Sequence, residues 1–507
     1  DGEYQMYSVS SGADQRAHWV KDNSELESIM TNLSDDELKA IKRGGFDHKK
    51  LYAAFDKASK SSEKPTVILV KTLKGYGLGE GSEGRNIAHQ KKTMSDDERI
   101  EIAKRLGIPL SDEECIDAKF YVPDQDSDEM KYLHKRRQDL GGYQPIRFED
   151  CKSLKAPDIE NFSDFTDGID RSISTTLALV RMMSKMLRDK EIGPYLVPII
   201  PDEARTFGMD GLFSQAGIYS PSGQQYEPVD AGTISPYKEA KDGQILQEGI
   251  CEAGALASFM AAGTAYSHSE LPMIPIYIFY SIFGMQRIGD MVWACGDAMT
   301  KGFLIGGTAG RTTLNGEGVQ HQDGHSHVLA STVPNMMTYD PAFAYELAVI
   351  MQDGIKRMYQ DKEDIFYYIT VYNENYTHPA MPNDAQDGIL KGMYCFKEAS
   401  DQLLSKFKGK PIHLLGSGSL MQQVIEAQEA LEKEGIPTYI WSVTSYNLLH
   451  RDFRDSKDSD KKSYIEETIE GFDGHFISVS DWITLLPDSI SHLFPGGLTT
   501  LGTDGYG

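Results

Sequence analysis

The chain has 507 residues, of which 40% are hydrophobic and 10% aromatic, and its formal net charge is −25. This length suggests about three domains. The strong negative charge and the lack of basic stripes argue against a nucleic-acid partner. The longest apolar run, 272–283, is about half of the ~20 residues that a membrane helix needs, so we expect no membrane span.

The cysteines point to a reducing compartment. An odd, scattered set without a CxxC pair fits the cytosol better than a disulfide framework, so we expect a cytoplasmic protein. The five cysteines are Cys115, Cys151, Cys251, Cys295 and Cys395. The chain starts at Asp1 without a methionine and ends on TDGYG, and we therefore expect it to be a piece of a longer protein.

Short apolar strands alternate with amphipathic helices, which predicts parallel sheets of the α/β class. We expect three domains, over residues 1–151, 152–381 and 382–507. The first is charged and rich in predicted helices. Its one clear strand, 66–73, leads into a KGYG sequence that starts at Lys74.

The second domain shows this alternation most clearly. Asp340 followed by Pro341 predicts an N-cap and the first residue of a helix. In chain order, the predicted elements are a helix 173–187, a strand 195–200, a helix 245–266, a strand 274–279, a helix 287–301, a strand 303–305, a helix 341–359 and a strand 365–371.

The third domain opens with a βαβ pattern: a strand 412–415, a helix 420–434 and a strand 438–443. The Gly-Ser-Gly-Ser turn 416–419 between the first strand and the helix has the form of a phosphate cradle. Such turns are also ordinary connections. Because a third glycine is missing at the right spacing, the motif favours the ordinary connection.

The loop 306–327 carries the densest set of chemically active side chains. It follows the apolar residues 303–305, so we place it at the end of a buried strand, where open α/β sheets bind their ligands. Its glycines let the backbone turn and approach a ligand closely. It contains His321, His325 and His327 in an HxxxHxH pattern.

Three interpretations of these histidines stay open. A metal site needs convergent ligands on stiff elements, whereas glycines surround this set and no cysteine joins it. The histidines can instead make structural hydrogen bonds. The pattern most favours an acid–base or substrate-orienting role for at least one of them.

Two pairs of acids are further candidates. Asp202 and Glu203 follow the predicted strand 195–200, and Glu203 either pairs with Arg205, caps the next turn, or meets a ligand at the strand end. Glu248 and Glu252 lie four residues apart on a predicted apolar helix, so we expect both on one face.

A glutamate among alanines and leucines is costly unless it is solvated, paired or functional. If one of Glu248 and Glu252 is buried, its pKa should be raised, which suits proton exchange with a cofactor ring. The residues alone do not choose between them. His89 lies in a polar loop, where a lone histidine is most often simply solvent-exposed.

Several long motifs occur in an order that is similar to the homodimeric, bacterial-type pyruvate dehydrogenase E1 component family, a group of transketolase-like thiamin diphosphate enzymes. The motifs are KGYG…NIAHQ, PDEARTFGMDG, QILQEGICEAG, FYSIFGMQRIGD, GRTTLNGEGVQHQDGHSH and LGSGS. The resemblance runs over essentially the whole chain. It implies a transketolase-like fold of successive doubly wound, mostly parallel sheets flanked by helices.

The resemblance also implies the chemistry. Thiamin diphosphate reacts as a ylid with pyruvate, and the protein supplies orientation and proton relays. After carbon dioxide leaves, a lipoyl group on the lipoyl domain of the E2 dihydrolipoyl acetyltransferase is reductively acetylated. By motif, Glu252 rather than Glu248 matches the glutamate on the cofactor's aminopyrimidine ring, and Phe283 matches the aromatic residue that packs on it.

Other residues receive roles from the same resemblance. His89 matches a mobile-loop histidine linked to transfer to the lipoyl group. The segment 222–238, with Gln224, Gln225 and Tyr226, matches a loop that folds over the site. The implied catalytic residues are Glu252, His321, His89 and Glu203, and the implied cofactor-binding residues are Phe283, Asp202, Glu317, Lys74, Tyr280 and Gln320.

One departure from the family pattern affects the metal. The GDG motif with its downstream asparagines, which holds Mg²⁺ and the diphosphate through oxygen ligands, is not found here, so we expect no metal ligands in this chain and the Mg²⁺ ligands before Asp1. The family site lies between two subunits, which implies a homodimer.

Two alternatives to this function remain. One is a ketol transferase like transketolase, which should need basic phosphate clamps; the GEGVQHQDGHSH stretch of the loop has no arginine, although Arg311 is close. The other is an inactive assembly or binding fragment.

Overall fold

The structure is a computed structural model, and it describes residues 2–21, 23–41, 44–79, 81–143, 151–201, 204–229, 231–232, 236–314, 316–457 and 461–506. The chain divides into two compact units, Asp1–Tyr143 and Gln144–Gly507, which are described separately. In the described ranges, no helix is both long and apolar enough to cross a membrane.

Unit 1 is helical in its described residues. Several of its helices begin with a capping box, in which a serine and an acid three residues later satisfy each other's backbone N–H groups. The helices are α1 (Gly2–Val9), α2 (Gly12–Val20), α3 (Ser24–Met30), α4 (Asp35–Ala40), α5 (His48–Ser59), α6 (Asp96–Leu106), α7 (Asp112–Ile116) and α8 (Asp128–Asp139).

The predicted strand 66–73 is wrong. These residues have no regular structure, and Val67 and Leu69 are 82% and 91% exposed. A strand must exchange backbone hydrogen bonds with a neighbour, and the part of unit 1 that the structure describes contains no strand. The apolar, β-branched sequence is therefore not sufficient to form one here.

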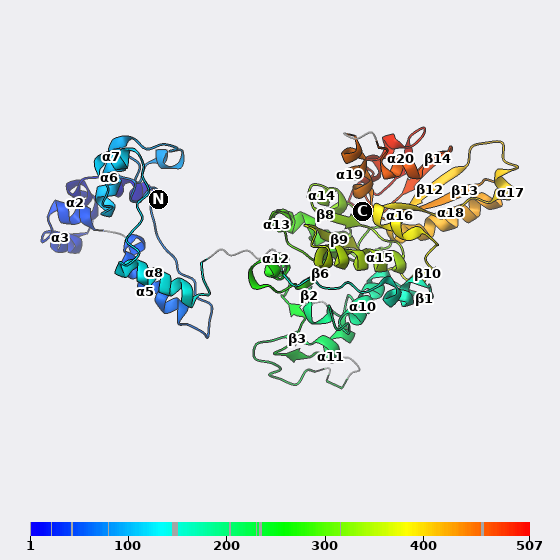
Figure 1. Ribbon diagram of the computed structural model, residues 1–507, viewed down its shortest axis with the longest axis horizontal. Coiled ribbons are helices and arrows are strands. Elements are labelled where there is room, and N and C mark those ends of the chain that lie inside the picture. The colour runs from blue at the N-terminus through cyan, green and yellow to red at the C-terminus, as the bar shows by residue number, and fades with distance from the viewer. Residues whose placement is uncertain are drawn as a thin grey trace. The chain divides into compact units, whose positions relative to one another are not determined.

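Unit 2 contains a parallel sheet with the order β5-β2-β6-β7-β9-β8 (Figure 1). Its strands are apolar on both faces, as expected for a parallel sheet covered by helices. The strands are β2 (Leu196–Ile200), β5 (Leu246–Gln247), β6 (Ile274–Tyr280), β7 (Phe303–Gly307), β8 (Met336–Tyr339) and β9 (Phe366–Thr370).

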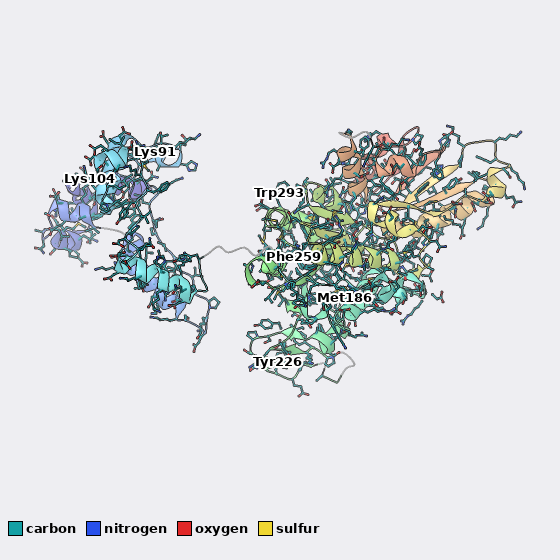
Figure 2. All side chains as sticks on the ribbon, in the orientation of Figure 1. Lys91, Lys104, Met186, Tyr226, Phe259 and Trp293 are labelled. Carbon is teal, nitrogen blue, oxygen red and sulfur yellow. The ribbon has the colours of Figure 1, made fainter. Side chains whose placement is uncertain are left out.

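Helices pack around this sheet in pairs: α12 contacts α13, and α10 contacts α15. Phe259 of α12 is buried, whereas Trp293 of α13 is 52% exposed (Figure 2). The helices of this region are α9 (Ser163–Thr166), α10 (Thr175–Met186), α11 (Phe213–Ala216), α12 (Glu252–Ser269), α13 (Met285–Asp297), α14 (Ser326–Ala330) and α15 (Ala344–Ile355), which a π-helical turn, Lys356–Gln360, extends.

A second sheet of unit 2 has the order β11-β13-β12-β14-β15, with β11 antiparallel and the other strands parallel. Its strands are β11 (Met393–Lys397), β12 (Ile412–Gly416), β13 (Thr438–Val443), β14 (His475–Val479) and β15 (Leu498–Leu501). Its helices are α16 (Ala385–Lys391), α17 (Asp401–Leu404), α18 (Met421–Lys433), α19 (Tyr446–Ser456), α20 (Tyr464–Thr468) and α21 (Leu485–Asp488).

Two short strand pairs complete the described architecture. The strand β1 (Ile169–Ile173) runs antiparallel to β10 (Tyr376–His378), and β3 (Ile218–Tyr219) runs parallel to β4 (Glu239–Ala240). The parallel sheets flanked by helices confirm the predicted α/β class.

Two helix starts differ from the prediction. Residues predicted as helix from 245 instead form β5, Gly249 takes a left-handed φ of 80°, and α12 begins at Glu252. The prediction that Glu248 shares a helix face with Glu252 is therefore wrong. Helix α15 begins at Ala344 rather than after Asp340, because Glu346 accepts the backbone N–H groups of the residues before it.

Candidate active site

An aromatic cluster forms where β6 and β7 end. Tyr280 closes β6, and the turn Ser281–Phe283 follows it. The ring of His321, from the loop after β7, lies 5.4 Å from the Tyr280 ring and 6.0 Å from the Phe283 ring. The structure thus brings together three of the residues that the sequence singled out, at the carboxyl edge of a parallel sheet, where ligands bind in this architecture.

Glu317 belongs to the same place. Its Oε2 lies 3.2 Å from Nδ1 of His321. That nitrogen is buried and makes no hydrogen bond within the described residues, so the contact is a close approach rather than an aligned bond. Gln320 is exposed, and its amide lies over Gly318, where a Cβ atom would collide with it.

Glu252 is connected to the aromatic cluster by Arg287, which contacts both Glu252 and Phe283. Arg287 donates from Nη1 to Oε1 of Glu252 at 2.8 Å, and its guanidinium carbon lies 4.0 Å from the centre of the Phe283 ring. The Glu252 side chain is 17% exposed and sits in the first turn of an 18-residue helix. The positive end of the helix dipole favours a carboxylate there.

Sequence reasoning missed Arg287. The helix predicted there starts at Arg287 itself, so helical spacing gave no reason to pair this arginine with Phe283 or with Glu252. Glu248 is placed elsewhere: its carboxylate accepts a hydrogen bond from Ser258, and its backbone N–H donates to Ile200 O at 3.0 Å. Of the two glutamates, only Glu252 is thus linked to Phe283.

Asp202 and Glu203 lie outside the described residues. Phe207, a few residues later, is buried and its ring lies 5.4 Å from the Tyr280 ring. The segment that follows β2 therefore reaches the aromatic cluster, as expected for neighbouring parallel strands.

Lys74 and His89 lie in unit 1, where the lysine Nζ contacts Nδ1 of the histidine. Both side chains are exposed, and His89 closes a short 3₁₀ turn, Asn86–His89. In the segment 222–238 of unit 2, Gln224 accepts the backbone N–H of Glu239 at 2.6 Å. Tyr226 is 57% exposed (Figure 2).

The three loop histidines occupy three different environments. His327 is buried against Trp482, its Nε2 lies 3.0 Å from Thr370 Oγ1, and burial lowers its pKa. His325 faces Asp323, with 3.7 Å between Nδ1 and Oδ1. Among the described residues, no group of three or more His, Cys, Asp or Glu side chains could hold a metal ion. The structure therefore supports a structural role for His327.

The turn 416–419 is an ordinary connection. Its serines are buried, and a Cβ atom on Gly418 would collide with the Tyr372 hydroxyl. This turn is covered by protein and does not present its backbone to a phosphate.

A buried carboxylate that the sequence reasoning overlooked joins the two segments of the site. Asp323 accepts hydrogen bonds from Ser281 Oγ and from the backbone N–H groups of His325 and Ser326, the latter two at 3.1 and 3.2 Å. The Ser281 hydroxyl also lies 3.2 Å from that of Tyr368. Asp323 thereby ties the turn carrying Phe283 to the loop carrying His321.

The fold places the chain in a known structural class. Transketolase from Campylobacter jejuni superposes with a TM-score of 0.59 at 16% identity, covering 91% of this chain and 62% of that one. Transketolase from Leishmania mexicana gives 0.59 at 15% identity, covering 92% and 61%. The chain is thus a transketolase-like α/β protein by fold.

Sequence comparison defines the family. Residues 154–379 match the family model described as pyruvate dehydrogenase E1 component middle domain, and residues 392–507 match the transketolase-like C-terminal domain. The pyruvate dehydrogenase E1 component of Pseudomonas aeruginosa is 49% identical, with 100% of this chain and 58% of the relative covered. That of Escherichia coli K12 is 46% identical, with 100% and 58% covered.

The chain belongs to the pyruvate dehydrogenase E1 component family. It spans little more than half the length of the curated relatives that it matches, 58% in both of the cases above.

Proposed function

We propose that this chain supplies the aminopyrimidine half of the active site of a thiamin diphosphate-dependent pyruvate dehydrogenase E1 component. The reaction is the decarboxylation of pyruvate with reductive acetylation of a lipoyl group on the E2 dihydrolipoyl acetyltransferase. The observation that carries the proposal is the link from Glu252 through Arg287 to Phe283, with His321 and Glu317 in the loop at the adjoining strand end. The names of the relatives that cover the whole chain support it.

The residues fit this cofactor. Phe283 is half-buried and offers an aromatic face, and Glu252 offers a carboxylate acceptor linked to it through Arg287. An acceptor next to an aromatic face suits a flat ring that carries N–H groups. When bound, thiamin diphosphate supplies a nucleophilic carbon that adds to the substrate carbonyl and takes up the electron pair released with carbon dioxide.

The residues of this chain would orient the cofactor and transfer protons. Glu252 holds a proton at a ring nitrogen of the cofactor through its carboxylate. Arg287 orients that carboxylate by binding Oε1. His321, with Glu317 3.2 Å from its Nδ1, would give or take a proton on the substrate. Asp202 and Glu203, which follow the neighbouring strand β2 in the sequence, remain candidates for contact with the cofactor or the substrate.

The ketol-transferase alternative is less well supported. It needs basic side chains that bind a sugar phosphate, and Arg311 is the arginine that the loop 306–327 itself supplies. Arg311 is already engaged, since its Nη1 donates to the carbonyl oxygens of Thr503 and Gly505. Identity is also 46–49% with the E1 components and 15–16% with the transketolases.

We further propose that Mg²⁺ is bound by residues of the whole protein outside this chain.

We also propose that the protein is a homodimer. Exposed apolar side chains on α12 and α13 are candidates for the subunit contact. They include Ala253, Ala257, Ala261 and Trp293, of which Trp293 is 52% exposed. Replacing Trp293 with glutamate should shift sedimentation toward the monomer, and an unchanged dimer would exclude this face.

Pyruvate-dependent reduction of an artificial electron acceptor, with thiamin diphosphate and Mg²⁺ present, tests the activity. It should be measured on this chain and on the chain extended to the length of its relatives. Turnover in the extended chain supports the proposal. No turnover with pyruvate but turnover with sugar-phosphate donors would favour the ketol transferase, and thiamin diphosphate binding without turnover would favour an assembly role.

A further inference from the structure

The larger sheet of unit 2 is the six-stranded β5-β2-β6-β7-β9-β8, and the smaller sheet is the five-stranded β11-β13-β12-β14-β15. The loop 306–327, which carries Glu317 and His321, is held at its first end by a residue that follows a strand of the smaller sheet. Asp481, which follows β14, is buried and accepts hydrogen bonds from the backbone N–H of Arg311 at 2.9 Å and of Thr312 at 3.1 Å. It also accepts the Thr312 hydroxyl at 3.0 Å. The Asp481 carboxylate, which follows a strand of the smaller sheet, thus binds the backbone of Arg311 and Thr312 in the loop that follows β7 of the larger sheet.

Glycine makes this approach possible. Gly310 has a φ of 85°, and a Cβ atom built on it would collide with Oδ2 of Asp481. A side chain at this position would therefore both strain the backbone and displace the carboxylate. The sequence of the loop is adapted to Asp481 as well as to its own turn.

The residues around Asp481 hold further parts of the same loop. Ile483 donates its backbone N–H to Gly324 O at 2.8 Å, near the second end of the loop. The Trp482 ring lies 4.6 Å from that of His327. Arg311 in turn donates a hydrogen bond to Gly505 O at 2.7 Å, so Gly505 also contacts the loop.

Between these anchors the loop makes only local backbone bonds to itself among its described residues. Glu317 N–H donates to Leu314 O at 2.9 Å, and His321 N–H donates to Gly318 O at 2.9 Å. Such turns shape the loop but do not fix it relative to the sheet. The positions of Glu317 and His321 against Phe283 therefore depend on the anchors at the two ends.

We propose that Asp481 is a positioning residue: the smaller sheet of unit 2 sets the place of Glu317 and His321 by holding the backbone of Arg311 and Thr312 through this carboxylate. The inference rests on the proposed function for the meaning of that placement. A misplacement of about 1 Å in a reacting group costs on the order of 10²-fold in rate, so a residue that never touches the substrate can have a large effect on kcat.

Asp481→Ala tests this role, and Asp488→Ala is its matched control. Asp488 ends helix α21, seven residues after Asp481, accepts the Thr500 hydroxyl at 2.8 Å, and is exposed to solvent. Both variants are made in the chain extended to the length of its relatives. Three measurements are made: hydrogen–deuterium exchange of peptides over 308–321, titration for the Kd of thiamin diphosphate, and steady-state kinetics for kcat and KM of pyruvate with an artificial acceptor.

Asp481→Ala should speed exchange in this loop about tenfold or more and lower kcat about 10- to 100-fold. The Kd of thiamin diphosphate should rise by a smaller factor than kcat falls, because Phe283 and Glu252 stand on other elements and only Glu317 and Gln320 of the implied cofactor contacts lie on this loop. Asp488→Ala should leave loop exchange, the Kd, kcat and KM unchanged. Equal loop exchange in the wild type and in Asp481→Ala would overturn the inference, as would a fall in cofactor binding that matches the fall in kcat.

A second variant covers the case in which Asp481→Ala does not fold. Thr312→Val removes one bond from the loop side and leaves the carboxylate in place, so it should raise exchange only over 308–321; no rise would overturn the inference. The exchange measurement also separates the two hypotheses. If the wild type neither binds thiamin diphosphate nor uses pyruvate, the proposed function fails, while loop exchange still shows whether Asp481 anchors the loop.

Discussion

Arg287 binds Glu252 and covers Phe283 at the same time: its Nη1 lies 2.8 Å from Glu252 Oε1, and its guanidinium carbon lies 4.0 Å from the centre of the phenyl ring. A planar guanidinium can do both, because it stacks on an aromatic face while its edge donates hydrogen bonds. The start of α12 is thereby coupled to the start of α13, and the orientation of the Glu252 carboxylate depends on a residue from a different helix.

Arg287→Ala should weaken thiamin diphosphate binding about three- to tenfold with little loss of stability. The Arg287 side chain is 48% exposed, and exposed ion pairs contribute at most about 1 kcal/mol. Isothermal titration with thiamin diphosphate, together with urea unfolding, measures the two effects. Arg287→Lys keeps the charge but not the planar fork, so it should recover less than half of the lost affinity. Full recovery would show that charge alone matters.

Glu252→Gln should reduce pyruvate turnover at least about 100-fold while the unfolding midpoint stays within a few degrees. The change removes a proton acceptor but preserves the volume of the side chain, and general acid–base groups contribute on the order of 10²- to 10⁴-fold. Glu248→Gln is the matched control, because that carboxylate binds Ser258 instead. A larger loss in Glu248→Gln than in Glu252→Gln would reverse the assignment of the two glutamates.

His89→Ala should spare turnover with an artificial acceptor and impair acetylation of an E2 lipoyl domain about tenfold or more, in the range of a lost acid–base group. His89 is exposed on unit 1 beside Lys74, where it is accessible to a large partner. Both assays use the chain extended to the length of its relatives. Equal losses in the two assays would refute a role confined to transfer.

Ser281→Ala should lower the free energy of unfolding by about 2 kcal/mol, because it leaves one oxygen of the buried Asp323 without its donor. Ser331→Ala is the control, since the Ser331 hydroxyl is exposed and donates only to Val328 O. Urea unfolding followed by circular dichroism gives both values. A difference below about 0.5 kcal/mol between the two variants would mean that the Asp323 bond contributes no more than a surface contact.

His413 makes the stability of unit 2 depend on pH. It is buried between the rings of Tyr439 and Phe476, and burial lowers its pKa from 6.5 to about 4. Because the unfolded chain binds the proton more readily, the stabilisation is fully present above pH 6.5 and is lost as the pH falls toward 4.

His413→Gln should therefore flatten the pH profile. From pH 7 to pH 5 the wild type should lose about 2 kcal/mol more than the variant, since each pKa unit corresponds to ~1.4 kcal/mol. Glutamine retains an acceptor for the indole N–H of Trp441, which lies 3.2 Å from His413. Parallel losses in the two proteins, measured by urea unfolding at both pH values, would assign the acid sensitivity to other groups.

The strands of the larger sheet were predictable because parallel strands buried on both faces must be apolar along their length. The run predicted at 195–200 is β2 (Leu196–Ile200), and that at 274–279 is β6 (Ile274–Tyr280). The start of α12 was not predictable in this way. It depends on Gly249 and on the bond from Glu248 N–H to Ile200 O, which only the assembled sheet provides.

Some residues of the candidate site could likewise be predicted from the sequence, and others could not. Glu252, Phe283 and His321 could be singled out because they follow strands or match long motifs. Arg287, Asp323 and Asp481 owe their roles to partners 35, 42 and 170 residues away in the sequence. A single sequence gives no local signal for such pairs, since an acid or arginine on a predicted surface has the same pattern whether it is solvated or buried.

The anchoring of the 306–327 loop has a consequence for protein engineering. Its ends are tied to Asp481 and to Ser281, whereas the stretch between Thr312 and His321 is shaped by its own turns. Exchanging side chains in that middle stretch should alter which 2-oxo acids are accepted, while the anchored ends of the loop keep their positions. Transplanting the loop into another scaffold should fail unless the host also provides a carboxylate in the place of Asp481.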